Sequence, residues 1–389
     1  MATDCDVLIV GAGVAGPLLA CALSGSGLRV VLCGQKPASP ASSEYDLRVS
    51  ALTPATIEIL SRLGVWGAVE PRAGRIETMR VWDESGGGEI SFDASETGQP
   101  ALARVAENIA VARTLAGRLA SSPDVEWLET RLTGLDATPE GARARFENGS
   151  TRTARVIVGA DGTNSTVRDL AGIAITQWPY VQSAIVAHVR TAKPHVNRAL
   201  QAFRPEGTLA FLPLPEANRT SIVWSADTAR AEALAALDEN GFRSELQHAI
   251  GNRLGEIETV TARAMVPLAR RHANSYIAER IALVADAAHQ IHPLAGQGLN
   301  LGVQDVMALA RELRAAHTAK RDLGSRRALR NYERERKGPN LAMLTAMDAF
   351  ARGFRVQFPP VVALRSVALS FTDRVAPLKE TFVRYASGL

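Results

Sequence analysis

The sequence predicts an α/β protein in which a Rossmann-like domain is interrupted by a smaller mixed or antiparallel sheet domain and followed by a helical C-terminus. The chain opens with an apolar run, a glycine-rich turn, an apolar helix and a second apolar run, the order of a parallel strand–helix–strand unit. A further buried strand and two long helices lie near its end. Between these regions, several segments alternate apolar and polar residues, as half-exposed antiparallel strands do.

Each expected element follows from a local pattern. The runs at 7–10 and 28–33 are apolar enough for strands buried on both faces, with a helix at 18–23 between them. Thr53 and Pro54 begin a helix to residue 63, because threonine caps helices and proline suits their first position. The other expected elements are a hairpin at 75–92, a helix at 108–120, strands at 155–158, 183–189, 220–225 and 281–285, and helices at 298–316 and 329–350.

These elements divide the chain into three parts. We expect a discontinuous nucleotide-binding domain, a sheet domain that binds the substrate, and a helical C-terminal segment. Their bounds are 1–74, 99–180 and 265–345 for the first, 75–98 and 181–264 for the second, and 346–389 for the third.

Composition excludes several classes of protein. The 389 residues are 46% hydrophobic and 22% charged, with a net charge of +4, which fits a globular protein. Charges of both signs alternate through most of the chain, which argues against a nucleic-acid partner. The three cysteines form no metal or disulfide pattern and suit a reducing compartment. Neither a signal peptide nor a membrane-spanning run is visible, so a cytoplasmic location is expected.

The first motif with chemical meaning is the glycine turn at 11–16. Gly11 permits a tight turn out of the strand, Gly13 lets the backbone approach a pyrophosphate, and Gly16 allows close packing of helix on strand. The start of the following helix then faces the phosphates. This pattern predicts a dinucleotide site; the alternative is a glycine-rich structural turn.

The acidic residue that usually holds the ribose is missing at the end of the second strand. Gly34 occupies its place and Gln35 follows, whose amide can bond a hydroxyl without charge assistance. We therefore expect weaker cofactor binding, and tighter binding if glutamate replaces Gly34.

Two further motifs follow strands. Asp161 and Gly162 come after the strand at 155–158, where an ordinary strand-end turn is the alternative reading. Asp286 ends the strand at 281–285, where it can accept hydrogen bonds from ligand hydroxyls. A loop after it leads to a helix whose first N–H groups favour negative charge on a ligand. The candidate residues there are Pro293, Gly296, Gln297, Gly298, Leu299 and Asn300. His289 and His292 lie in this expected loop without a third ligand, so no metal site is predicted.

In this order and spacing, the three motifs resemble the group A flavoprotein monooxygenases, which have the p-hydroxybenzoate hydroxylase-like fold. The resemblance implies that the glycine turn binds the FAD pyrophosphate and that Asp161 and Gly162 belong to the motif for FAD and NAD(P)H. It also implies that Asp286 contacts the ribityl chain and that Gly296, Gln297 and Gly298 lie beside the isoalloxazine ring.

Other segments are similar to the ubiquinone-biosynthesis hydroxylases of this group. These segments are 47–54, 63–66, 203–207, 212–214, 223–224, 267–268 and 377–379. Arg48 matches a family arginine near the cofactor, with an ordinary loop cation as the alternative. Near Arg113 the family places a residue against the flavin, and a one-residue shift would place Ala112 there instead. The family usually has glycine where this chain has Ala285.

The resemblance implies an NAD(P)H-dependent FAD enzyme that uses O2 to hydroxylate the aromatic ring of a polyprenylated phenol or quinone precursor. NAD(P)H would bind transiently, because no second glycine motif is present. No catalytic side chain can be named from the sequence. The alternatives are an FAD-dependent reductase or dehydrogenase without oxygen insertion, and a non-catalytic flavin-binding scaffold of a biosynthetic complex.

The C-terminal segment carries an excess of positive charge. Residues 351–389 have a net charge of +4, as large as that of the whole chain. Residues 361–374 form an amphipathic pattern that suits a helix in the membrane interface. A helix packed on the main domain or on a partner subunit is the alternative. The protein could therefore lie on the inner membrane as a peripheral protein, join a biosynthetic complex or form a homo-oligomer.

Overall fold

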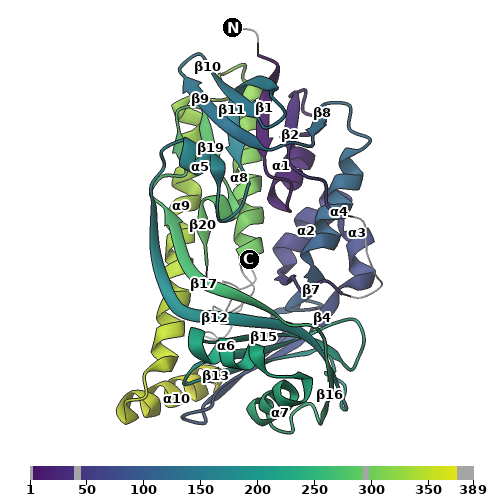
Figure 1. The fold of residues 1–389 in the computed structure, drawn as a ribbon, viewed down its shortest axis with the longest axis vertical. Coiled ribbons are helices and arrows are strands. Elements are labelled where there is room, and N and C mark those ends of the chain that lie inside the picture. Colours follow the sequence, from purple (N-terminus) through teal and green to yellow (C-terminus); the bar gives the residue numbers. More distant parts are fainter. Residues whose placement is uncertain (1–2, 39–44, 292–297, 375–389) are drawn as a thin grey trace.

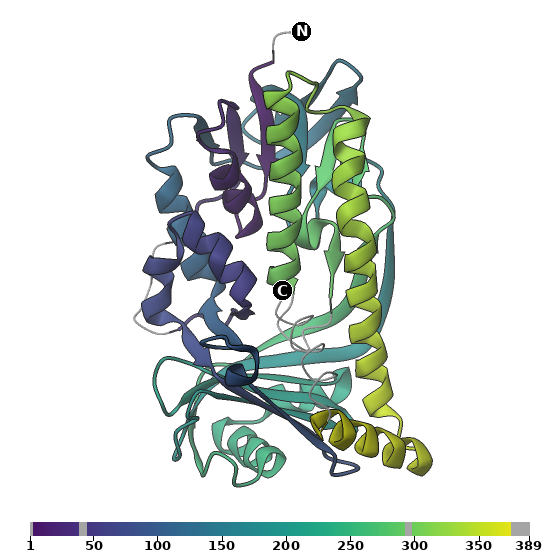
Figure 2. The same cartoon turned by 180° about the vertical axis from the view of Figure 1, so that it is seen from behind.

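The computed structural model describes residues 3–38, 45–291 and 298–374. Two large sheets lie at opposite ends of an elongated molecule, the upper and lower sheets of Figure 1. Helix α9 (Arg326–Arg355) runs along one side between them, as both views show (Figures 1 and 2). The expected α/β fold with a helical C-terminus is confirmed.

The upper sheet is mainly parallel, as the opening strand–helix–strand unit predicts. Its order is β18-β19-β11-β1-β2-β8, and β1 pairs in parallel with both β2 and β11. The strands are β1 (Cys5–Val10), β2 (Val30–Cys33), β8 (Val125–Leu128), β11 (Thr151–Gly159), β18 (Ile277–Ala278) and β19 (Ile281–Leu283), with β9 (Leu132–Thr138) and β10 (Gly141–Phe146) attached to β11. The carboxyl ends of β1, β2, β11 and β19 therefore meet at one edge.

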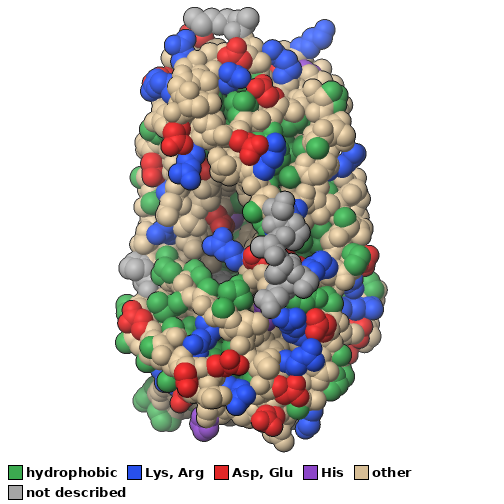
Figure 3. Space-filling view, turned by 45° about the vertical axis from the view of Figure 1, so that its right-hand side comes forward, with side chains coloured by type: hydrophobic (Ala, Val, Ile, Leu, Met, Phe, Trp, Pro, Cys, Tyr) green, Lys and Arg blue, Asp and Glu red, His purple; other side chains and the backbone are tan. Residues whose placement is uncertain are grey.

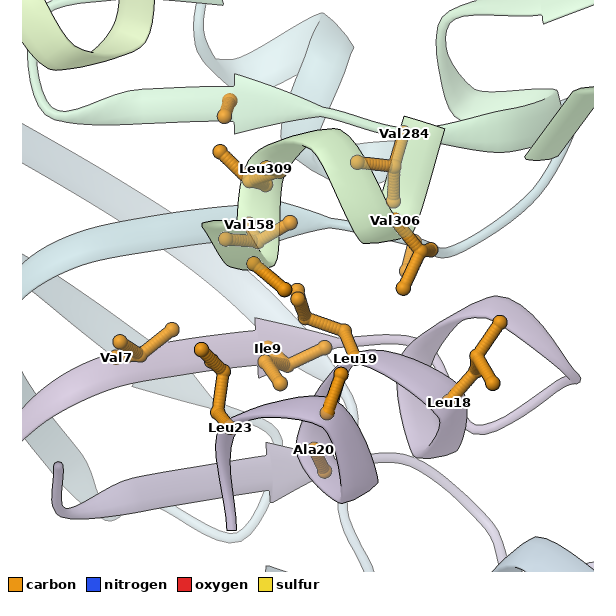
Figure 4. Close-up of a cluster of buried hydrophobic side chains, with 14 of the residues drawn as sticks. Val7, Ile9, Leu18, Leu19, Ala20, Leu23, Val158, Val284, Val306 and Leu309 are labelled. Carbon is orange, nitrogen blue, oxygen red and sulfur yellow. The ribbon is translucent and has the colours of Figure 1, made fainter. Parts of the chain in front are cut away.

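Apolar helices cover this sheet. Ile9 of β1, Leu19 of α1 (Ala15–Leu23) and Val306 of α8 (Gly298–Thr318) belong to one buried cluster, and Figure 4 shows them between the strands and the two helices. The remaining helices of this part are α2 (Pro54–Arg62), α3 (Trp66–Val69), α4 (Asn108–Leu119) and α5 (Thr166–Leu170), with short 3-10 turns η1 (Glu70–Arg72), η2 (Ala94–Thr97) and η3 (Ala285–Ala287). Thr53 caps α2, as expected.

The lower sheet is mixed, mostly antiparallel, with the order β20-β17-β12-β15-β14-β13-β5-β6 and with β16 attached to β12. The pairing of β13 with β5 is parallel, and β5 and β6 form the expected hairpin. The strands are β5 (Thr78–Asp83), β6 (Glu89–Asp93), β12 (Ile175–Thr191), β13 (Arg198–Arg204), β14 (Gly207–Pro213), β15 (Arg219–Asp227), β16 (Ile257–Val260), β17 (Ala264–Ala273) and β20 (His289–Gln290). Its outer face packs on α6 (Thr228–Ala236) and α7 (Glu239–Ile250).

A small sheet of β3 (Val49–Leu52), β7 (Ala103–Glu107) and β4 (Gly74–Ile76) packs against the inner face of the lower sheet. Helix α10 (Pro359–Arg374) lies beside β6 at the lower end (Figure 1). Strand β12 is continuous across the boundary expected at 180 and 181. The division into domains therefore stays a prediction.

Candidate active site

The three sequence motifs lie side by side at the carboxyl edge of the upper sheet. The N–H of Ala160 donates to the carbonyl of Val10 at 2.7 Å, and the N–H of Val284 donates to the carbonyl of Gly159 at 3.0 Å. The loops that follow β1, β11 and β19 are thereby joined at their first residues. We call these loops, together with the first turn of α8, the motif edge.

The glycine turn has the geometry that a phosphate site needs. Gly11 has φ +118°, and a Cβ there would lie 2.2 Å from the carbonyl oxygen of Ala160. A Cβ on Gly16 would lie 1.8 Å from the carbonyl oxygen of Gly11. Within the described part of the chain, and apart from its two chain neighbours, no atom lies within 4 Å of a Cβ built on Gly13. The first and last glycines are thus required by the protein itself, whereas Gly13 leaves open space for a ligand.

The geometry of Gly34 argues against the expectation that glutamate at position 34 would tighten cofactor binding. Gly34 has φ +149°, and a Cβ there would lie 2.8 Å from the Cβ of Ala12 inside the glycine turn. The backbone of Gly34 is also held on both sides, by the carbonyl of Leu128 and the indole N–H of Trp127. A side chain would therefore displace the phosphate loop. The side chain of Gln35, which follows, is exposed.

Asp286 lies at the motif edge, directly after β19, in the turn η3. Its side chain is exposed, and no described residue hydrogen-bonds it. Desolvation by the surrounding protein nevertheless raises its pKa, while the charges of His289 and Arg48 oppose that rise. Exposure together with desolvation is typical of a carboxylate inside a hollow. Figure 3 shows such a hollow on one face, with acidic and basic side chains inside it.

The two arginine candidates, Arg48 and Arg113, have different surroundings. Arg48 is exposed, and its positive charge opposes the rise in the pKa of Asp286. Arg113 of α4 donates from Nε to the carbonyl of Ala38 at 2.5 Å, in the loop that follows Gly34 and Gln35. The neighbouring Ala112 is 4% exposed and lies in the core. Of the two alternatives, the structure thus turns Arg113 toward the loop after β2.

Comparison with known proteins shows the family to which the chain belongs. The pattern of the FAD binding domain family matches residues 4–346. The ubiquinone hydroxylase UbiL of Rhodospirillum rubrum is 38% identical over 98% of this chain and 89% of its own length. The 3-demethoxyubiquinol 3-hydroxylase of Escherichia coli is 35% identical over 99% of this chain and 98% of its own.

The chain belongs to this family of FAD-dependent aromatic monooxygenases.

Solved structures agree on the fold of the flavoprotein. A p-nitrophenol 4-monooxygenase from Pseudomonas putida aligns with a TM-score of 0.80 and 20% identity, over 100% of this chain and 99% of the other. A probable FAD-dependent monooxygenase from Pseudomonas aeruginosa aligns with a TM-score of 0.77 and 26% identity, over 94% and 99%. The resemblance to the group A monooxygenases is thus confirmed.

The residues of the motif edge fit FAD. The open space at Gly13 lies at the start of α1, where backbone N–H groups can donate to the oxygens of a pyrophosphate. The carboxylate of Asp286, which no described residue hydrogen-bonds, suits the hydroxyls of a ribityl chain. In the first turn of α8, the described atom nearest to a Cβ on Gly298 is Cγ2 of Ile291, at an ordinary contact distance of 3.6 Å. Pro293, Gly296, Gln297 and His292 lie outside the described residues.

Two predicted cofactor residues turn their side chains into the protein. Asn300 is buried; its Oδ1 accepts from the hydroxyl of Thr56 at 2.8 Å, and its Nδ2 donates to the carbonyl of Ala51 at 2.9 Å. It thus joins the start of α8 to the junction of β3 and α2. The carboxylate of Asp161 accepts from Ser165 Oγ at 2.5 Å and from the N–H of Val167 at 3.1 Å, at the start of α5.

Gly162, with φ +81°, completes this turn after β11. The side-chain contacts are those of a strand-end turn, so the proposed FAD contacts of Asp161 and Gly162 would come from the backbone. Leu299 packs partly against the core beside α1 and α8. These assignments stay predictions.

A buried polar cluster beneath Asp286 was missed by the sequence analysis. Asp305 of α8 is fully buried and accepts hydrogen bonds from Nε2 of His289 at 2.5 Å, Nε of Arg336 at 2.8 Å and Nδ2 of Asn340 at 2.9 Å. It also accepts from the N–H of Ala285 at 3.2 Å, next to Asp286. Burial alone would raise the pKa of Asp305, but His289 and Arg336 outweigh it and hold this pKa below its ordinary value.

This cluster gives His289 a structural role. His289 bonds Asp305, which in turn holds the backbone of Ala285 at the motif edge. Among the described residues, no group of three histidine, cysteine or acidic side chains is arranged to hold a metal ion. Arg168 was missed as well. It is buried and donates to the carbonyls of Thr163 at 3.0 Å and Ala287 at 3.3 Å, so it ties the second motif to the third.

The cysteines are not nucleophiles. All three are buried, and burial raises the pKa of Cys5 and of Cys21 to about 12 and that of Cys33 to about 11. Their thiols therefore stay protonated near neutral pH, and the reactive thiolate is absent. This agrees with a site whose bond chemistry comes from a cofactor.

Proposed function

We propose that this chain uses FAD, NAD(P)H and O2 to hydroxylate the aromatic ring of a polyprenylated phenol or quinone precursor in ubiquinone biosynthesis. The observation that carries the proposal is the meeting of three FAD-type motifs at one edge, in a chain whose relatives along nearly its full length are named for this chemistry. A monooxygenase from zebrafish named for ubiquinone biosynthesis is 33% identical over 98% of this chain.

Bound FAD supplies the redox chemistry: electrons from NAD(P)H reduce O2, one oxygen atom enters the ring and the other leaves as water. The side chains and backbone of this chain bind and orient the reactants. We propose that Gly13 admits the pyrophosphate, that Asp286 accepts bonds from the ribityl hydroxyls and that Arg48 offsets the charge of Asp286. The proposed cofactor-binding residues are Gly11, Gly13, Gly16, Gln35, Arg48, Arg113, Asp161, Gly162, Asp286, Pro293, Gly296, Gln297, Gly298, Leu299 and Asn300.

The test is turnover of a short-chain prenylated phenol by the purified holoenzyme. The proposal requires NAD(P)H oxidation, O2 consumption and a hydroxylated product in comparable amounts. Flavin reduction without oxygen in the product would indicate a reductase or dehydrogenase instead. A protein that binds FAD but turns over none of these reactants would indicate a scaffold.

We further propose that the enzyme binds the inner-membrane surface through α10. One side of α10 packs on the β5–β6 hairpin, where Arg365 donates from Nε to Asp83 at 2.6 Å. The other side carries Leu364 and Val367, which are 70% and 66% exposed. Phe358, just before the helix, is 63% exposed. A prenylated substrate resides in the bilayer, so this apolar strip would bring the enzyme to it.

Three of the six basic residues of the C-terminal segment have acidic partners. Arg352 pairs with Asp348, Arg355 with Asp227 and Arg365 with Asp83. Because these three arginines are already paired, we propose that they add less to the attraction of anionic headgroups than the exposed apolar side chains add by insertion. No helix in the described ranges has the length and apolarity to cross a membrane.

Sedimentation with anionic liposomes tests the contact. The double variant Leu364→Glu, Val367→Glu should lose most of the liposome-bound fraction, while Leu170→Glu, a matched change at an exposed leucine of α5, should keep it. Equal binding of both variants would remove α10 as the membrane contact.

A further inference from the structure

The strand pairing of the lower sheet shows which side chains point to its inner face. Leu200 and Ala202 of β13 belong to the cluster that packs on α6 and α7 at the outer face. Because side chains alternate along a strand, Gln201 points to the opposite, inner face. Its strand neighbours on that face are Ala199 and Phe203.

The residues paired across the strands with Gln201 form one row on this inner face. All of them except Gln201 are apolar. In order across the sheet, the row is Ala264, Val186, Val223, Ala210, Gln201, Val81 and Ile90. Val186, Val223 and Ala210 are only half-buried. We call this row the sheet floor: an accessible apolar surface that contains one amide.

The floor is covered on both sides of Gln201. Ala199 packs with Ala51 and Val105 of the small sheet. Phe203 stacks on Phe354 of α9, with ring centroids 3.8 Å apart. Gln201 therefore lies between the small sheet and α9.

The start of α8 lies beside the same place. Met347 of α9 packs against the cluster around Phe203 and also against the cluster that holds Leu301 and Ile291. Leu301 is one residue beyond Asn300, in the first turn of α8. The sheet floor and the motif edge are thus neighbours.

Gln201 is 6% exposed as a residue, and its amide makes no hydrogen bond to the described residues. Its polar atoms are not among those that are fully enclosed without a partner, so the amide keeps some access to the space beside the floor. A polar group on a largely apolar surface is a natural hydrogen-bonding point for a ligand that covers that surface, because the ligand would otherwise bury it without a partner. An amide can both donate and accept, which suits a ring hydroxyl or carbonyl. The apolar neighbours suit the ring itself.

From this we infer that Gln201 is a specificity-determining residue, which hydrogen-bonds an oxygen substituent of the substrate ring while the sheet floor holds the ring. This inference rests on the proposed function for its substrate class. It assigns to Gln201 the choice of how the ring is turned, and hence which ring carbon faces the flavin.

Two probes test it on the FAD-loaded enzyme without turnover: a phenol with a short prenyl chain, and the matched prenylbenzene, which lacks the hydroxyl. Dissociation constants follow from the change in flavin absorbance on binding. The wild type should bind the phenol about tenfold more tightly than the prenylbenzene, the effect of one neutral hydrogen bond in a desolvated site. In Gln201→Met, which keeps the length of the side chain, the preference should fall below about twofold.

Gln182→Met is the matched control. Gln182 is also buried in the lower sheet, but its amide already donates to the carbonyl of Glu206 at 3.2 Å. This control should keep the tenfold preference. An unchanged preference in Gln201→Met, or a wild type that binds both probes equally, would overturn the inference, and the second result needs no variant to fold.

Failure of the proposed function gives a different result. A wild type that shows the Gln201-dependent preference but forms no hydroxylated product would refute hydroxylation and leave the assignment of Gln201 intact. Hydroxylation by an enzyme that binds the phenol and the prenylbenzene equally would support the proposed function and refute the assignment of Gln201.

Discussion

The methyl group of Ala285 fills the space that a side chain at position 302 would need. A Cβ built on Gly302 would lie 2.7 Å from the Cβ of Ala285. Ala285 itself has φ +53°, a left-handed conformation that favours glycine. The resembled family usually has glycine at this position. Alanine therefore brings both backbone strain and a steric demand to the residue before Asp286.

This relationship predicts coupling between the two positions. Gly302→Ala should destabilise the protein by about 1–3 kcal/mol, the usual range for overpacking. In an Ala285→Gly background the same change should cost less than about 1 kcal/mol, because the opposing methyl group is gone. Urea unfolding of the four proteins, at one FAD concentration, gives the coupling free energy. If the effects of the two substitutions on the free energy of unfolding simply add, Ala285 can shift to make room for the new methyl group without loss of stability.

Asp286→Asn should weaken FAD binding but stabilise the apoprotein near neutral pH. Loss of a charge-assisted hydrogen bond costs about 2 kcal/mol, or roughly 30-fold in affinity. Because the folded-state pKa of Asp286 is raised, the ionised carboxylate disfavours folding at pH values above that pKa.

The stabilisation by asparagine should therefore shrink as pH falls through the raised pKa, and it should vanish below the unfolded-state value. Apoprotein unfolding at pH 7 and pH 4, with fluorescence titration of FAD, measures both effects. Full FAD content in the variant would refute the assignment of Asp286.

Asp305→Asn should destabilise the protein by about 3–5 kcal/mol, because Arg336 would be left buried without its counter-charge. The folded-state pKa of Asp305 is lowered, so its contribution is present above the unfolded-state pKa and is lost as pH falls through the folded-state value. The wild type should thus approach the variant in stability at acid pH.

Asp322→Asn is the control for this change. Asp322 also pairs with an arginine, Arg280, but its side chain is 42% exposed. The effect there should stay below about 1 kcal/mol. Equal losses at both positions, measured by thermal unfolding, would contradict the importance of the buried cluster.

Two glycines at the motif edge should respond differently to alanine. Gly34→Ala should lower both stability and FAD affinity, because its Cβ would press on Ala12 at 2.8 Å and φ is +149°. Gly13→Ala should leave stability within about 0.5 kcal/mol, since no protein atom is near, yet weaken FAD binding by tenfold or more. An unaffected FAD affinity in Gly13→Ala would place the pyrophosphate elsewhere.

The sequence predicted those parts of the fold that depend on local pattern. The apolar run at 7–10 and the turn at Gly11 and Gly16 specify a strand and a close helix contact within a few residues of each other. The first strand, its helix and the later parallel strands were therefore found. Helix α9 begins earlier than predicted because Ser325 caps it, and it continues to Arg355, beyond its predicted end.

Side-chain direction was harder to predict than position. Asn300 and Asp161 stand where cofactor ligands are expected, but partners distant in the sequence or one turn away take up their polar groups. Asp305 and Arg336 were missed because their pairing joins two helices. A signal existed: Asp305 stands between apolar Val303 and Val306 on the buried side of α8.

The most direct test of the central claim is oxygen-isotope labelling. The FAD-loaded enzyme is given NAD(P)H and a short-chain prenylated phenol under 18O2, and the product is analysed by mass spectrometry. The account predicts a ring-hydroxylated product that carries one 18O atom and that forms only when NAD(P)H is present. A product without 18O, or NAD(P)H oxidation that leaves the phenol unchanged, would contradict it.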